Sequence, residues 1–145
     1  MATAHHHQLL PYTPAQLYDL VADIEKYPAF LPGCSKARIL SQSDTEVIAA
    51  LTVQYGPFQE TYTSRVHLTP KSRIDVEYVD GPFQHLKNDW TFSAAENNMT
   101  TVEFFIDFKF QNLLFQKASQ LVFEKAFGKV MEAFTQRAHD LYGKN

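Results

Sequence analysis

The chain has 145 residues and a mass of 16.6 kDa, and a chain of this size buries roughly 68% of its unfolded surface, which is enough for one hydrophobic core. Sixteen acidic and thirteen basic residues give a net charge of -3. No run of like charge is long enough to neutralise a row of phosphates, so the composition does not indicate a nucleic-acid-binding protein. We expect a single domain spanning residues 1–145.

The absence of membrane, secretion and disulfide signals in the sequence predicts the cellular compartment of the protein. No apolar stretch approaches the roughly 20 residues of a membrane-spanning helix, and the first ten residues do not resemble a signal peptide. The single cysteine, Cys34, has no partner for a disulfide or a zinc site, and we interpret its thiol as a small buried group. These features predict a cytoplasmic protein, with peripheral contact at the inner face of the membrane left open, and they leave the oligomeric state undetermined.

Three consecutive histidines, residues 5–7, lie near the start of the chain. Neighbouring side chains on a strand point to opposite faces, so three adjacent imidazoles cannot converge on one ion. We expect no metal site here and interpret the segment as a frayed polar terminus or part of a tag.

The first strong helix signal begins at Thr13. Thr13 is a good N-cap, Pro14 suits the first helical position, and Gln16 completes a capping-box pattern. Apolar residues recur at helical spacing up to Ile24, which predicts an amphipathic helix over residues 14–25. Prolines 28 and 32 then leave room for only a short helical turn before Gly33.

From about residue 34 the hydrophobic period changes to two. Residues 47–55, 58–68, 74–78 and 99–110 each alternate between an apolar and a polar face, with turn-forming residues between them. This pattern is typical of an antiparallel meander with one buried face.

The segment 112–143 contains no proline and carries an apolar stripe at the 3.6-residue period. We expect it to form one long helix that covers the apolar face of the sheet. The predicted fold is therefore α+β: a curved antiparallel sheet of about seven strands wrapped around a long C-terminal helix, with one or two short helices after the first strand.

Four blocks carry a family resemblance: "YTPAQLYDLVADIEKYPAFLPGC", "VDGPFQHLKNDWTF", "VEFFIDFKF" and "VMEAFTQRAHDLYG". Together they resemble the family of the ribosome-association toxin RatA and the coenzyme-Q-binding START-type proteins, within the helix-grip (START/Bet v 1-like) superfamily of polyketide cyclases and lipid-transfer domains. The resemblance covers residues 8–143, and residues 27–34 and 79–92 are its most specific parts. It implies two alternative roles: binding of coenzyme Q in support of respiration, or binding to the large ribosomal subunit to block subunit joining.

The apolar face supplies the candidate binding residues, which either pack a core or line a ligand cavity. Each buried methylene is worth about 0.8 kcal/mol, so aromatic walls would bind a polyprenyl lipid without hydrogen bonds. The candidates on the sheet are Tyr55, Phe58, Tyr62, Tyr78, Phe83, Trp90, Phe104 and Phe108, and those on the long helix are Phe123, Phe127, Val130 and Phe134. Phe30, Leu31 and Pro32 form a candidate lid or membrane-facing tip, because an exposed apolar patch is otherwise hard to justify.

The sequence does not indicate a catalytic function. We find no nucleophile, carboxylate pair or metal-ligand spacing, and the alternation places Arg65 and His67 on the solvent side of their strand. We therefore expect a non-catalytic protein without a cofactor, whose ligand is ubiquinone or another lipid and which contacts membranes transiently. The ribosome remains the alternative partner, although acidic residues are interspersed among the basic ones.

Overall fold

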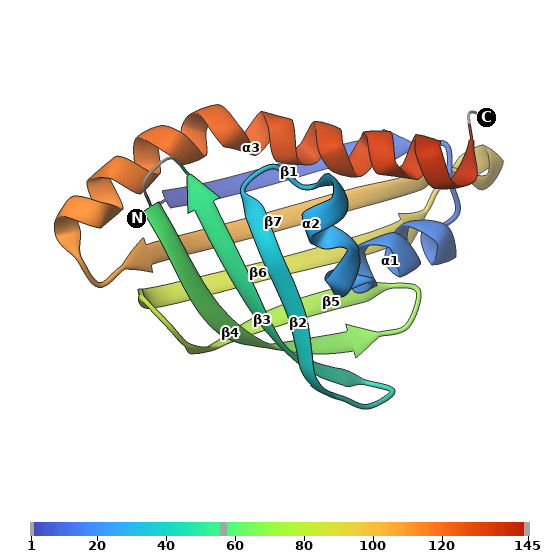
Figure 1. Ribbon diagram of the computed structural model, residues 1–145. Coiled ribbons are helices and arrows are strands. Elements are labelled where there is room, and N and C mark those ends of the chain that lie inside the picture. Colours follow the sequence, from blue (N-terminus) through green and yellow to red (C-terminus); the bar gives the residue numbers. More distant parts are fainter. Residues whose placement is uncertain (1, 56–57, 144–145) are drawn as a thin grey trace.

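The computed structural model describes residues 2–55 and 58–143 and has the predicted order of elements (Figure 1). A first strand is followed by three short helical segments, six more strands and a long helix. Their bounds are β1 Ala2–Leu10, α1 Pro14–Ala22, a 3-10 turn Ile24–Lys26, α2 Tyr27–Phe30, β2 Cys34–Gln42, β3 Glu46–Tyr55, β4 Phe58–Thr69, β5 Arg73–Asp80, β6 Phe83–Ala94, a 3-10 turn Glu96–Asn98, β7 Thr100–Phe110 and α3 Leu113–Tyr142.

The seven strands form one antiparallel sheet in the order β1-β7-β6-β5-β4-β3-β2. The sheet curves strongly, and α3 runs along its length while α1 and α2 lie beside the C-terminal half of that helix (Figure 1). This arrangement confirms the predicted α+β helix-grip fold, because one apolar sheet face needs a second layer to exclude water. No helix in the described part of the chain is long and apolar enough to cross a membrane.

The first helix is shorter than predicted. Its N-terminus has the expected capping box, since the Gln16 amide donates to Thr13 Oγ1 at 3.2 Å and the Thr13 amide donates to Gln16 Oε1 at 3.0 Å. Its C-terminus comes at Ala22, because Asp23 adopts a non-helical ψ of 69°. Ile24, which we placed in the same helix, begins the following 3-10 turn but is still buried in the core.

The histidine-rich segment is ordered in a strand, so the first of our two interpretations, a frayed terminus, is wrong. Residues 5–7 lie in β1 and pair with Phe105, Phe104 and Glu103 of β7. The ladder satisfies their backbone groups, and the alternation turns His6 inward, where its ring lies 6.1 Å from that of Phe127. Within the described ranges, no group of three or more histidines, cysteines and acidic residues is placed to hold a metal ion.

Contacts of Tyr12 connect the two ends of the chain. Tyr12 is buried, its hydroxyl donates to the carbonyl oxygen of Gly143 at 2.7 Å, and it also contacts His139 Nδ1. Tyr142 donates to the carbonyl oxygen of Gln16 at 2.8 Å. These bonds hold the C-terminal end of α3 against α1 and the segment that precedes it.

Candidate functional site: an apolar cavity beneath the long helix

A cavity of about 210 Å³ lies between the inner face of the sheet and the helices. Its walls come from β3 to β7 on one side and from α1, α2 and the C-terminal half of α3 on the other. This volume is small for a ligand site. It is below the ~300–1,000 Å³ typical of sites for drug-sized ligands, so the cavity fits a group about the size of one substituted ring.

Aromatic rings form the wall where α3 meets the sheet. The Trp90 ring lies 4.6 Å from that of Phe104 and 4.9 Å from that of Phe134, measured between centroids. Tyr27 of α2 completes this wall at 5.7 Å from Phe134. Such edge-to-face contacts fix the rings in place, so a ligand would meet a rigid apolar surface.

The segment Leu31–Cys34 forms the outermost part of the cavity wall. Pro32 is exposed, whereas Ile74 and Ser64 on the sheet side are fully buried, so the mouth lies at this segment and the floor lies on β4 and β5. Gly33 takes a φ of +84°, a conformation that favours glycine and allows the sharp change of direction into β2.

Two titratable groups of the wall, Tyr27 and Cys34, are held in their neutral forms. Burial raises the pKa of Tyr27 far above its ordinary value, and its hydroxyl contacts the carbonyl oxygen of Val21. Burial also raises the pKa of the Cys34 thiol. The described lining residues include no aspartate, glutamate, histidine, lysine or arginine. The site can therefore bind an apolar group, but it offers no tuned acid, base or thiolate.

Besides Tyr27, Tyr62 and Cys34, two polar side chains lie in the apolar lining, Ser64 of β4 and Asn88 of β6. Ser64 is 2% exposed, and its hydroxyl has no hydrogen-bond partner among the described residues. Asn88 Nδ2 donates to the carbonyl oxygen of Phe105 at 2.9 Å. Both positions face inward, because they alternate with outward-facing neighbours on their strands.

The predicted binding residues divide into several groups. Those that line the cavity are Tyr62, Trp90, Phe104, Val130 and Phe134, together with Leu31 and Pro32 of the predicted lid. Phe127 instead lines an open groove of about 830 Å³ along α3 and β1. The side chains of Tyr55, Phe58 and Phe123 lie outside the described part of the structure.

Three of the predicted residues, Tyr78, Phe83 and Phe108, lie away from the cavity and correct our assignment. Phe83 and Phe108 belong to a second buried cluster, against which Tyr78 packs. There the Phe83 ring stacks on Phe110 at 4.4 Å between centroids. The prediction failed because alternation identifies the face of a strand on which a residue lies, but not its position along the cavity.

Phe30 is packed rather than exposed. Its ring lies 5.4 Å from that of Phe134, and the Arg137 guanidinium lies over it at 5.2 Å from the centroid. Phe30 therefore attaches α2 to α3, and only Leu31 and Pro32 of the predicted lid reach the cavity mouth.

Sequence reasoning missed the small and polar residues of the cavity. Ala49 leaves space opposite Ser64, with which it is paired across β3 and β4, and Cys34 and Tyr27 also line the cavity. The sequence feature that could have identified them is a polar residue at an inward-facing position on an otherwise apolar face of a strand. Ser64 between Tyr62 and Val66 fits that description, as does Asn88 between Leu86 and Trp90.

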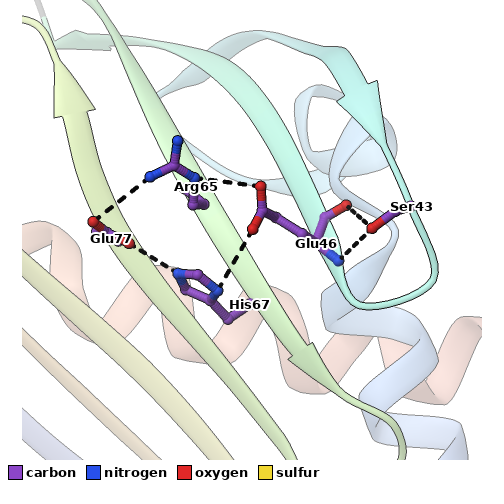
Figure 2. A network of polar contacts seen from close by, with 5 residues as sticks. All are labelled: Ser43, Glu46, Arg65, His67 and Glu77. Atoms are coloured by element: carbon purple, nitrogen blue, oxygen red, sulfur yellow. Dashed lines mark hydrogen bonds and ion pairs between the residues drawn. The ribbon is translucent and has the colours of Figure 1, made fainter.

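The outer face of the sheet carries charges that neutralise one another. Figure 2 shows Arg65 between Glu46 at 3.3 Å and Glu77 at 3.8 Å, with His67 bonded to Glu77 at 2.9 Å. The His67 hydrogen bond, followed by the Arg65 charge, holds the pKa of Glu77 below its ordinary value. The solvent-side placement of Arg65 and His67 is confirmed, and this network lies on the face opposite the cavity.

The curved sheet, the long helix and the apolar cavity between them define a helix-grip protein. The chain belongs to the polyketide cyclase / dehydrase and lipid transport family, whose sequence model matches residues 10–135.

Two curated relatives illustrate the range within this family. The ribosome association toxin RatA of Rickettsia prowazekii is 39% identical, over 97% of this chain and 99% of its own length. The mitochondrial coenzyme Q-binding protein COQ10 homolog B of Xenopus laevis is 29% identical, over 94% of this chain and 58% of its own length.

Solved structures share the architecture. An 18 kDa protein from Caulobacter crescentus has a TM-score of 0.78 and 34% identity, covering 99% of this chain and 100% of its own. The Zhui aromatase/cyclase of Streptomyces has a TM-score of 0.82 at 18% identity, covering 94% of this chain and 93% of its own, and this likeness bears on the fold alone.

Proposed function

We propose that the protein is a non-catalytic carrier or chaperone that binds ubiquinone or a related polyprenyl lipid in the cavity beneath α3. The observation that carries the proposal is the aromatic and aliphatic lining of the cavity between sheet and helix. The relative named for coenzyme Q binding supports the ligand class. Burying one aromatic-sized group contributes about 1.5–3 kcal/mol, and each additional methylene that leaves water adds about 0.8 kcal/mol.

A non-catalytic role fits the chemistry of the wall. General acid–base catalysis needs a group with a pKa near neutrality, but burial keeps both the Tyr27 hydroxyl and the Cys34 thiol protonated. Delivery of a lipid requires contact with a membrane, and we propose that Leu31 and Pro32 at the cavity mouth make that contact. The protein would then be cytoplasmic and would meet the inner face of the membrane transiently.

Ligand extraction tests the proposal directly. Organic extraction of protein purified from its native host, followed by mass spectrometry, is expected to recover a quinone or another polyprenyl lipid. Titration with a short-chain ubiquinone is expected to quench the fluorescence of Trp90, which lines the cavity and is the single tryptophan. Repeated extraction without lipid, combined with no response in the titration, would overturn the proposal.

Two adjacent alanines on β3 provide matched variants. Ala49 is buried in the cavity wall, whereas Ala50 lies on the opposite face of the strand. Ala49→Leu adds three carbons inside a space of about 210 Å³ and is expected to weaken quinone binding more than tenfold. Ala50→Leu makes the same change outside and should bind like wild type. Equal effects of the two substitutions on quinone binding would show that the ligand binds outside this cavity.

Association with the large ribosomal subunit is the second candidate, because the relative named RatA is more similar than the one named for coenzyme Q, at 39% against 29% identity. The paired charges around Arg65 do not provide a basic surface for rRNA on that face. Sucrose-gradient sedimentation with added protein is the measurement. Co-sedimentation with the large subunit that persists in Ala49→Leu would support a ribosomal role independent of the cavity, and absence of co-sedimentation would remove this candidate.

A further inference from the structure

Ser64 is a buried donor without an acceptor. It lies on the inner face of β4, it is 2% exposed, and its hydroxyl has no hydrogen-bond partner within the described ranges. Its cross-strand neighbours are Ala49 on β3 and Tyr78 on β5. Buried hydroxyls are normally paired because the loss of hydration is otherwise uncompensated, so an unpaired one at the wall of a cavity indicates a partner that enters the cavity.

Asn88 provides a second polar group on the same wall. Because Asn88 Nδ2 donates to the carbonyl oxygen of Phe105 at 2.9 Å, the orientation of its amide is assigned by that bond. Asn88 lies on β6 and Ser64 on β4, so the two polar groups are separated by β5 across the floor of the cavity.

Size limits what these groups can bind. The cavity of about 210 Å³ accommodates one substituted ring but not an extended polyprenyl chain. The floor is closed, since Ser64 and Ile74 are fully buried, while the wall at Leu31–Cys34 is partly open to solvent. A long ligand must therefore place one end at the polar floor and let the remainder leave through the mouth.

We infer that the polar ring of the ligand binds innermost, with a ring carbonyl oxygen accepting a hydrogen bond from the Ser64 hydroxyl and Asn88 offering a second polar contact. This inference rests on the proposed function and adds the orientation of the ligand and the residue that selects a carbonyl. The apolar chain passes Leu31 and Pro32 toward solvent or a membrane. The reverse orientation would place a hydrocarbon against an unpaired hydroxyl, which leaves its hydration uncompensated.

The test compares two ligands on three proteins. The ligands are a dimethoxy-methyl-1,4-benzoquinone with a short prenyl chain and a benzene ring that bears the same chain but no oxygen. The proteins are wild type, Ser64→Ala and the matched control Ser93→Ala, which removes an exposed hydroxyl from β6. We expect Ser64→Ala to weaken quinone binding about fivefold, the typical net effect of one neutral hydrogen bond, and to leave binding of the hydrocarbon unchanged or tighter. Ser93→Ala is expected to bind both ligands like wild type.

Unfolding of the ligand-free proteins supplies a second readout. Since Ser64→Ala removes a buried hydroxyl that has no partner, we expect it to unfold at the same temperature as wild type or at a higher one. A lower unfolding temperature would show that the hydroxyl serves the fold and would overturn the inference.

The binding outcomes separate this inference from the proposed function. An equal change for both ligands, or no change for the quinone, would overturn the role of Ser64 while lipid binding in the cavity stands. If wild type binds neither ligand, both the inference and the proposed function are overturned.

Discussion

Gly81 shows how one residue without a side chain shapes the cavity wall. It lies in the turn between β5 and β6 with a φ of +144°, and a Cβ added there would lie 2.7 Å from the Cβ of Tyr62. Tyr62 in turn lines the cavity. The "DGPF" block of the sequence is thus explained by a close approach between this turn and β4.

We predict that Gly81→Ala destabilises the protein by about 3 kcal/mol, because backbone strain adds to the clash with Tyr62. Gly143→Ala is the matched control, since Gly143 also has a positive φ of +80° but has no atom within 4 Å of an added Cβ. Gly143→Ala should lower the free energy of unfolding by about 1 kcal/mol. Urea unfolding of both variants measures the difference, and equal losses would mean that the contact with Tyr62 is relieved at no cost.

Ser64 and Asn88 mark the limit of prediction at the scale of single residues. The alternation of β4 identifies its inner face, but we treated that face as uniformly apolar and passed over Ser64. Whether a buried hydroxyl has a partner depends on atoms from neighbouring strands, and one sequence does not reveal their register. A polar residue at an inward position is therefore better interpreted as a candidate ligand contact than as an exception to the pattern.

At the scale of elements, one carboxylate joins three strands. Asp107 of β7 accepts hydrogen bonds from Thr3 of β1 and from His85 of β6, the latter at 2.7 Å. The Thr3 hydroxyl, followed by His85, holds the pKa of Asp107 below its ordinary value. Because the pKa is lower in the folded protein than in the unfolded chain, the carboxylate stabilises the fold above the unfolded value of about 3.9, and this contribution is lost as the pH falls through the folded value.

We therefore predict that Asp107→Asn lowers the free energy of unfolding by about 1 kcal/mol at pH 7, and that the difference from wild type shrinks as the pH falls through the folded pKa of Asp107. Urea unfolding between pH 7 and pH 3 checks this expectation. Asp44→Asn, in the exposed turn between β2 and β3, is the control and should follow wild type throughout. A difference that does not shrink as the pH falls would show that charge is not the cause.

Element identity was the most predictable part of this structure. Period-two alternation located β3, β4, β5 and β7, and an uninterrupted helical stripe located α3. Prediction failed at two element ends. The non-helical backbone of Asp23 ended α1 early, and pairing with β7 ordered a histidine segment that is polar by composition. The second failure arises because contacts between segments that are distant in sequence override local preference.

At the scale of the whole molecule, ligand binding and stability are coupled. A ligand that binds only the folded protein stabilises it by about 2.7 kcal/mol at a concentration of 100 times its dissociation constant. For a domain of this length, that stabilisation raises the unfolding temperature by roughly 5–10 °C.

We predict that a short-chain ubiquinone produces such a shift in wild type and in Ala50→Leu but not in Ala49→Leu. Thermal unfolding followed by circular dichroism at increasing ligand concentrations is the measurement. A shift of equal size in Ala49→Leu would mean that the stabilising site is not the cavity beneath α3.

The order of the strands also determines when the molecule can fold. β1 is made first, yet its only neighbour in the sheet is β7, so that Leu10 pairs with Thr100 and Ala2 with Phe108. During synthesis β1 cannot pair until nearly a hundred further residues have been added. The apolar inner face of the sheet stays exposed to solvent until α3 has also been made. Pairings so distant in sequence slow folding, because much chain entropy is lost before the contacts form. A nascent chain that stalls before residue 100 is thus expected to expose its apolar strands and to depend on chaperones until synthesis resumes.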